Sequence, residues 1–225
     1  LSETECAEQK ILVTESLFSM DGDVVPLDKY AEICRETETA LIVDEAHAVG
    51  VYGEKGSGLI EEFGISNEVF LSINTAGKAL GVSGAFVAGS AQTIDFLINR
   101  CRSFIFSTAP LPVCATALSK AMEIVQHDFE LRNKLLDLSK YFRNLLNEQG
   151  FEASQDNTQI IPIMIGESRK AVELANKMQN EGFDVRAIRP PTVPEGTSRL
   201  RVSLNVNLTE KDLENFVKSL VKYLK

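Results

Sequence analysis

Five side chains able to carry out chemistry directly follow predicted strands in this sequence: Ser19, Asp44, His47, Thr75 and Lys78. Lys78 stands out because glycines and small residues surround it, and glycine lets another group approach the backbone closely. A lysine in such surroundings can lose its proton and become an amine nucleophile that forms Schiff bases. A lone lysine is more often a solvated surface charge. The chemical interpretation therefore depends on the other four side chains.

Asp44 and His47 lie three positions apart, directly after a predicted strand over 40–43. A turn cap and an ordinary hydrogen-bonded histidine would explain this pair without any chemistry. If Lys78 instead holds an aldehyde cofactor such as pyridoxal phosphate, Asp44 can keep the ring nitrogen protonated. His47 can then hydrogen-bond the phenolic oxygen or transfer protons. Thr75 can hold the phosphate with its hydroxyl, or that hydroxyl can serve as a simple cap.

Alternating strands and helices place these side chains at one edge of a predicted α/β sheet. The pattern predicts strands at 11–14, 40–43, 69–73 and 85–88, and helices at 28–37, 59–63 and 93–100. Such a sheet is largely parallel, and its ligands bind beyond the C-terminal ends of the strands. We therefore expect the five side chains to gather at that edge.

The second half of the chain has a different pattern. It predicts strands at 104–106, 160–165, 185–188 and 200–204, and helices at 113–126, 128–149, 168–181 and 209–224. We expect residues 1–128 to be part of a large cofactor-binding domain and 129–225 to form a smaller α+β domain. Ser168 is predicted to cap its helix. The expected inward-facing residues include Ile33, Leu131 and Leu224.

Composition excludes several classes of function. The net charge of −9 argues against a nucleic-acid-binding protein, which needs a basic stripe. No apolar run approaches the roughly 20 residues of a membrane span. The polar start at 1–5 does not resemble a signal peptide. The four cysteines are scattered without metal or disulfide spacing, which fits a reducing cytoplasm.

A competing interpretation is a nucleic-acid ATPase of the DEAH-box type, because 44–47 reads Asp-Glu-Ala-His. That class also needs a phosphate loop ending in Gly-Lys-Ser or Gly-Lys-Thr. The single Gly-Lys pair, Gly77-Lys78, fails this pattern twice, with Ser72 in place of the first glycine and Ala79 in place of the hydroxyl. The acidic charge also disfavours this interpretation.

Several runs match a known family in order and spacing: 14–23, 43–50, 75–81, 107–112 and 189–194 with 199–201. In these runs the chain resembles the α-oxoamine synthases, pyridoxal-phosphate enzymes of the aspartate-aminotransferase fold, called fold type I. The resemblance covers essentially the whole chain. It implies an incomplete α/β large domain followed by a smaller α+β C-terminal domain.

The resemblance also implies roles for individual residues. Lys78 holds the cofactor, Asp44 pairs with the ring nitrogen, His47 and Ser19 lie near the phenolic oxygen, and Thr75 contacts the phosphate. Ser107 or Thr108 reaches the site of a partner subunit, because family members are homodimers with shared sites. Arg201 binds the carboxylate of the amino acid, a bidentate task that suits guanidinium.

Within the family, the run at 187–194, which contains Arg189, is most similar to the enzymes that act in biotin synthesis. The reaction thus implied joins L-alanine to pimeloyl-CoA, or to the pimeloyl thioester of a carrier protein, and releases CO₂. Glycine C-acetyltransferase and serine palmitoyltransferase-like activities are the alternatives within the family.

The family's chain begins well before the equivalent of Leu1. We therefore expect this chain to be a C-terminal portion, without the glycine-rich phosphate loop or the residue that stacks on the cofactor ring. Weak or absent cofactor binding and no turnover are expected of this portion alone. A folded but inactive scaffold is thus the alternative of a different class.

Overall fold

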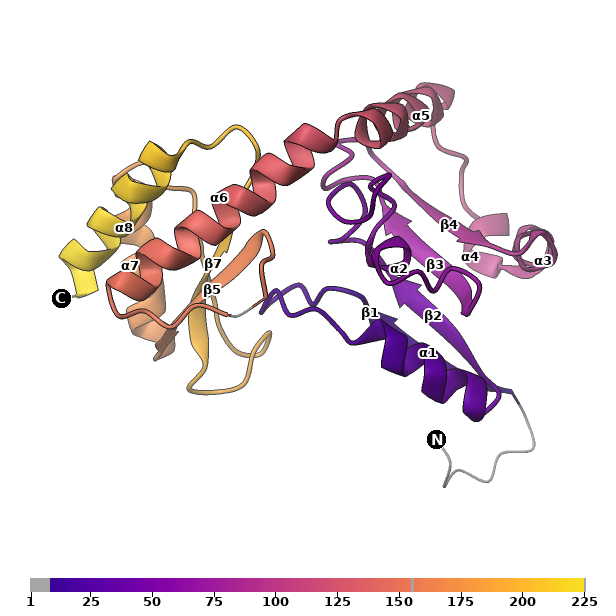
Figure 1. The fold of residues 1–225 in the computed structure, drawn as a ribbon, viewed down its shortest axis with the longest axis horizontal. Helices are drawn as coiled ribbons and strands as arrows, with labels where there is room; N and C mark the ends of the chain where they lie inside the picture. The colour runs from indigo at the N-terminus through magenta and orange to yellow at the C-terminus, as the bar shows by residue number, and fades with distance from the viewer. Residues whose placement is uncertain (1–8, 155, 225) are drawn as a thin grey trace. The chain divides into compact units, whose positions relative to one another are not determined.

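A computed structural model describes residues 9–154 and 156–224, which form two compact units (Figure 1). Unit 1 contains the chain up to Leu17 and then Val25–Phe129, and unit 2 contains Phe18–Val24 and Glu130–Lys225. The short segment Phe18–Val24 thus belongs to unit 2, although unit 1 precedes and follows it in the sequence. The polar start at 1–5 and Cys6 lie outside the described residues.

Unit 1 is built on a four-stranded sheet in the order β1-β2-β3-β4. Its strands are β1 (Lys10–Glu15), β2 (Thr39–Asp44), β3 (Val69–Thr75) and β4 (Ala85–Gly89). The first three strands are parallel, and β4 runs antiparallel to β3. Asp44 is in register with both Glu15 and Ile73, so the C-terminal ends of these strands meet at one edge. This is the largely parallel sheet that the sequence predicts.

The helices of unit 1 differ strongly in burial. They are α1 (Leu27–Glu36), α2 (Leu59–Glu62), α3 (Ala91–Arg100), α4 (Arg102–Ile105) and α5 (Pro112–His127). Helix α1 buries Leu27, Ala31 and Cys34, but Ile33, predicted to face inward, is 44% exposed. Helices α3, α4 and α5 contain no buried residue in the described structure.

The predicted strand over 104–106 is wrong. These residues fall in and directly after α4, because the backbone N–H groups of Phe104 and Ile105 both donate to the carbonyl of Cys101. An isolated apolar triplet satisfies strand and helix patterns equally well. The helical hydrogen bonds decide here, since no strand pairs with this segment in the described sheets.

Unit 2 consists of a three-stranded antiparallel sheet, in the order β5-β7-β6, packed with helices. Its strands are β5 (Ile160–Gly166), β6 (Arg186–Ile188) and β7 (Ser198–Ser203). Its helices are α6 (Phe129–Glu148), α7 (Ser168–Asn180) and α8 (Glu210–Leu224). Phe142 and Phe216 meet edge to face at 5.5 Å in a core where Met178, Leu200 and Leu220 are fully buried.

Three detailed predictions for unit 2 are wrong. Ser168 is the first helical residue rather than the cap, which is Glu167, and the Ser168 hydroxyl lies 3.0 Å from that of Ser198. Leu131 and Leu224 are 41% and 40% exposed. Both leucines lie near the ends of their helices, where the amphipathic pattern continues past the last core contact.

No described helix combines the length and apolar character needed to cross a membrane.

Candidate functional site

Asp44 ends β2 and begins the turn that carries the predicted site. Its Oδ1 accepts a hydrogen bond from the backbone N–H of Ala46 at 2.8 Å, so one carboxylate oxygen caps the turn. The N–H of Glu45 donates to the carbonyl of Ile73 at 2.8 Å, which ties the turn to β3. The second oxygen of Asp44 accepts no hydrogen bond from the described residues. It is therefore available to a ligand.

His47 and Lys78 meet in front of this edge. The Nζ atom of Lys78 lies 3.0 Å from Nε2 of His47. Lys78 is exposed and His47 is half-buried. A charged ammonium can only donate, so it pairs with a histidine whose Nε2 carries a lone pair. The pair can thus hold and pass a proton between an amine and an imidazole.

The two loops carrying His47 and Lys78 pack directly against each other. A Cβ added to Gly50, which has φ +84°, would lie only 2.8 Å from the Cβ of Ala79. Beside this contact, Val49, Ala76 and Leu80 form a buried apolar cluster. Glycine at position 50 therefore permits the close approach that brings the imidazole and the amine together.

The hydroxyl of Thr75 lies at the end of β3 and is buried. It is the one buried side-chain polar atom of the described residues without a hydrogen-bond partner. Buried polar groups are nearly always hydrogen-bonded in native proteins, and an exception calls for an explanation. A bound anion that accepts from this hydroxyl would provide one.

Glu45 is the polar residue that sequence reasoning missed. Its carboxylate is fully buried and accepts hydrogen bonds from the Ser16 hydroxyl at 3.1 Å and from the N–H groups of Leu59 and Ile60 at 2.9 and 2.7 Å. Burial raises the pKa of the Glu45 carboxyl, and these hydrogen bonds oppose the shift. Glu45 thus caps α2 and is structural. Gly58 is its sequence signal, since a Cβ there would lie 2.3 Å from Glu45 Oε2.

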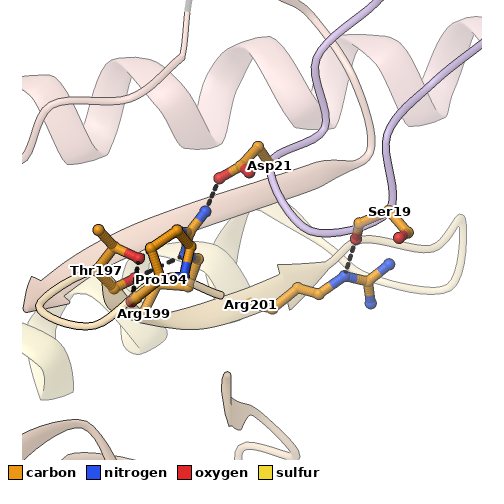
Figure 2. Close-up of polar contacts among 6 residues, drawn as sticks. All are labelled: Ser19, Asp21, Pro194, Thr197, Arg199 and Arg201. Atoms are coloured by element: carbon orange, nitrogen blue, oxygen red, sulfur yellow. Dashed lines mark hydrogen bonds and ion pairs between the residues drawn. The ribbon is translucent and has the colours of Figure 1, made fainter. Parts of the chain in front are cut away.

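Unit 2 holds the predicted arginine site (Figure 2). The Nε–H of Arg201 donates to the carbonyl of Ser19 at 2.5 Å, and Nη1 donates to the hydroxyl of Ser203 at 2.9 Å. No described residue accepts a hydrogen bond from Nη2. Burial lowers the pKa of Arg201, but an arginine stays charged at neutral pH. The guanidinium is therefore a partly buried cation with an available donor.

A second arginine, Arg199, lies on the same face of β7 as Arg201, two residues away. It is 5% exposed and forms an ion pair with Asp21. Its Nε and Nη2 donate to the carbonyl and hydroxyl of Thr197 at 3.0 and 3.2 Å. Figure 2 shows Arg199 and Arg201 reaching the same short segment, at Asp21 and at Ser19.

The remaining predicted residues make fewer contacts. Thr108 is exposed between α4 and α5 of unit 1, and Arg189 is exposed directly after β6 of unit 2. Neither side chain has a hydrogen bond to a described residue. The structure thus gathers Asp44, His47, Thr75 and Lys78 at one sheet edge, and Ser19 with Arg201 in unit 2. The described residues contain no cluster of His, Cys, Asp or Glu suited to a metal ion.

The model for the family "Aminotransferase class I and II" matches residues 1–220. The chain belongs to this aminotransferase family. The 8-amino-7-oxononanoate synthase of Marinobacter nauticus is 43% identical over 220 residues, which are 97% of this chain and 56% of that protein. The chain thus spans a little more than half the length of that relative.

Solved structures confirm the aminotransferase fold. A serine palmitoyltransferase variant from S. paucimobilis, with a bound PLP–myriocin aldimine, matches 99% of this chain and 56% of its own, with a TM-score of 0.93. At 23% identity this match concerns the fold alone. The 8-amino-7-oxononanoate synthase of Francisella tularensis has a TM-score of 0.85 and 30% identity, over 95% of this chain and 62% of that one. The predicted fold type I architecture is confirmed.

Proposed function

We propose that the protein carrying this chain is a pyridoxal-phosphate-dependent α-oxoamine synthase in which Lys78 holds the cofactor. The observation that carries the proposal is the group of four polar side chains at one sheet edge. It places an amine 3.0 Å from an imidazole, with a carboxylate and a buried hydroxyl at the adjoining strand ends. The similarity to 8-amino-7-oxononanoate synthases supports the same assignment.

The residues of this edge fit the cofactor's functional groups. The unpartnered hydroxyl of Thr75 suits a phosphate oxygen, which would accept its hydrogen bond. The second oxygen of Asp44 suits a protonated ring nitrogen. Lys78 offers an amine for the aldehyde. Each of these side chains thus has a complementary group on pyridoxal phosphate.

Pyridoxal phosphate, when bound, supplies an aldehyde that condenses with amines and a ring that withdraws electrons from the α-carbon of an amino acid. Nζ of Lys78, as a neutral amine, would take the proton from that α-carbon. His47 Nε2, 3.0 Å away, accepts a hydrogen bond from Nζ and orients the lone pair. The side chain of Asp44 would pair with the ring nitrogen of the cofactor.

The arginine site of unit 2 supplies the substrate contact in this proposal. Arg201 binds the carboxylate of the amino acid, with Nη2 as the available donor. Ser19 contacts Arg201, and Arg189 directly follows β6, whose Ile188 pairs with Arg199. The Ser19 hydroxyl serves the cofactor's phenolic oxygen, and Arg189 contributes to recognition of the substrates.

We assign the substrates by similarity to the 8-amino-7-oxononanoate synthases. They are L-alanine and pimeloyl-CoA, or the corresponding carrier-protein thioester, as in biotin synthesis. Thr108, exposed between α4 and α5, reaches the site of a second subunit in a homodimer. The protein acts in the cytoplasm, which the free thiols of Cys34, Cys101 and Cys114 support. Residues 1–128, apart from the segment Phe18–Val24 that belongs to unit 2, serve as the cofactor domain, and 129–225 serve as the smaller domain.

Product analysis tests this assignment and its alternatives. The full protein is supplied with L-alanine, glycine or L-serine, each against pimeloyl-, acetyl- and palmitoyl-CoA, and the products are identified by mass. The proposal predicts 8-amino-7-oxononanoate from L-alanine and the pimeloyl thioester. A product from glycine and acetyl-CoA, or from L-serine and palmitoyl-CoA, would assign one of the alternative activities. Absence of every product from the holoenzyme would favour the inactive scaffold.

A further inference from the structure

The segment Phe18–Val24 is a closed loop fastened to unit 2. Its ends are joined by a hydrogen bond from the N–H of Phe18 to the carbonyl of Asp23 at 3.0 Å. The N–H of Gly22 donates back to the carbonyl of Phe18 at 2.9 Å. These two bonds hold Ser19, Met20 and Asp21 at the tip of the loop. The tip therefore moves as one body if the loop moves.

The Gly22 end of the loop is pinned against the start of β5. The hydroxyl of Thr158 donates to the carbonyl of Gly22 at 2.8 Å, and the N–H of Val24 donates to Asp156 at 3.0 Å. A Cβ at Gly22 would lie 2.3 Å from the carbonyl oxygen of Ile160, so only glycine fits. Gly22 has φ +74°, which also favours glycine. This end of the loop is thus fixed by sterics and by hydrogen bonds.

The other side of the loop is held by the ion pair of Asp21 and Arg199. All three guanidinium nitrogens have acceptors, because Nε and Nη2 donate to Thr197 and Nη1 pairs with Asp21. The Thr197 hydroxyl in turn donates to the carbonyl of Pro194 at 2.7 Å. Arg199 is 5% exposed, and Thr197 holds its guanidinium from a second side. Asp21 is therefore tied to a side chain with a fixed position.

Arg201 depends on this loop for one of its acceptors. The carbonyl of Ser19, two residues before Asp21, accepts the hydrogen bond from Arg201 Nε at 2.5 Å. Ser203 accepts from Nη1, and together these two bonds set the plane of the guanidinium. A guanidinium binds a carboxylate bidentately in its own plane, so the orientation of that plane matters for recognition. The position of the loop tip thus decides where the donors of Arg201 point.

We propose that Asp21 and Arg199 are positioning residues that orient Arg201 for the substrate carboxylate, acting through the Ser19 carbonyl. This inference rests on the proposed function, in which Arg201 binds that carboxylate. The alternative is an ion pair that only stabilises unit 2. The two differ in what the pair controls, because a purely structural pair would not discriminate between ligands with and without a carboxylate.

The test uses the full protein loaded with its cofactor. The two probes are L-alanine and ethylamine, which is L-alanine without the carboxylate. Their dissociation constants are measured from the cofactor's absorbance. Asp21→Asn is expected to raise the dissociation constant of L-alanine about tenfold, because a charge-assisted hydrogen bond is misoriented. The dissociation constant of ethylamine is expected to change by less than about twofold. Asp21→Glu, which keeps the charge, is expected to restore part of the affinity. Glu173→Gln breaks the exposed pair with Arg169 in the same unit and serves as the matched control.

Hydrogen exchange provides a readout that needs no ligand. Asp21→Asn is expected to speed amide exchange at Gly22 and Val24 and to leave the β5–β7 ladder unchanged. Equal losses for both probes, or unchanged exchange in the loop, would overturn the positioning role. Arg201→Ala tests the carboxylate assignment separately from the positioning role of Asp21. If Arg201→Ala leaves L-alanine affinity unchanged, the carboxylate assignment itself fails. If it weakens L-alanine while Asp21→Asn does not, only the positioning role fails.

Discussion

The lysine site of unit 1 and the arginine site of unit 2 differ in how fully their polar groups are satisfied. Arg199 contacts Asp21 and Thr197, and Arg201 contacts Ser19, so the short run 19–21 links the two sets of contacts. At the other site, the buried Thr75 hydroxyl has no hydrogen-bond partner among the described residues, and only one oxygen of Asp44 accepts a hydrogen bond from them. Unsatisfied buried groups are costly, whereas networks that are complete keep a fixed geometry. The arginine site is thus prebuilt apart from Nη2 of Arg201, whereas the lysine site has several groups whose partners belong to a ligand.

The largest effect is expected at the centre of the lysine site. Lys78→Ala removes the amine that holds the cofactor and takes the α-proton, and should lower kcat by about a thousandfold or more. Turnover of the full protein with L-alanine and the pimeloyl thioester measures this loss. Lys29→Ala, at an exposed lysine of α1, should keep activity. Comparable activity in Lys78→Ala and Lys29→Ala would contradict the catalytic role of Lys78.

At the prebuilt site, Arg201→Ala should raise the KM for L-alanine about a hundredfold, because a charged pair with the carboxylate is lost. Arg201→Lys should recover little, since an ammonium cannot make both the Ser19 and the Ser203 contacts in one plane. The measurement is steady-state kinetics with varied L-alanine at saturating thioester. Full recovery with lysine would show that charge alone matters and that the orientation does not.

Glu45 provides a satisfied carboxylate next to the partly satisfied Asp44. Glu45→Gln removes one acceptor for the α2 N–H groups and should lower the free energy of unfolding by about 2 kcal/mol at neutral pH. Chemical denaturation measures this change, and Glu32→Gln, on an exposed side chain, is the control. A loss of activity without loss of stability would contradict the structural role.

Glu45 also has a predicted pH dependence. Burial raises the pKa of its carboxyl above the ordinary 4.5, so the folded state keeps the proton to higher pH than the unfolded state. The contribution of Glu45 to stability therefore falls as the pH rises above about 4.5, until the folded state also ionises. Denaturation at several pH values should show this fall in wild type and a flatter profile in Glu45→Gln. A rise in the wild-type contribution over that range would contradict the assignment.

The smallest effect is expected at Thr75. Thr75→Val keeps the shape and removes the unpartnered hydroxyl, so the protein without cofactor should be as stable or slightly more stable. The same change should raise the dissociation constant of pyridoxal phosphate about fivefold, because one hydrogen bond to phosphate is lost. Cofactor titration and thermal unfolding measure the two effects. Reduced stability without cofactor would mean that the hydroxyl already has a partner in the protein.

The sequence predicted that Asp44, Thr75 and their neighbours His47 and Lys78 lie at one sheet edge, because each of the four either ends a strand or lies three residues after its end. Strand ends are readable from apolar runs, and parallel strands bring their ends together. The contact between His47 and Lys78 also depends on Gly50, whose missing side chain allows the loops to touch. Glu45 was missed because two of its partners are backbone N–H groups of a later helix, and Gly58 is the single signal of this contact in the sequence.

The arginine network could be predicted only in part. Ser19 and Arg201 are 182 residues apart, and nothing local indicates that Phe18–Val24 packs on β7. Arg201 was predicted from family resemblance, whereas the role of Arg199 depends on that long-range packing. The apolar triplet at 104–106 failed for the opposite reason, because the local pattern was ambiguous and only hydrogen bonding decided it.

Mapping the site of cofactor attachment tests the central claim most directly. The full protein is mixed with pyridoxal phosphate, reduced with borohydride, digested and analysed by mass spectrometry. The account predicts a pyridoxyl group on Lys78, and none on the exposed Lys29 or Lys55. An unlabelled Lys78, or labelling spread evenly over surface lysines, would contradict it.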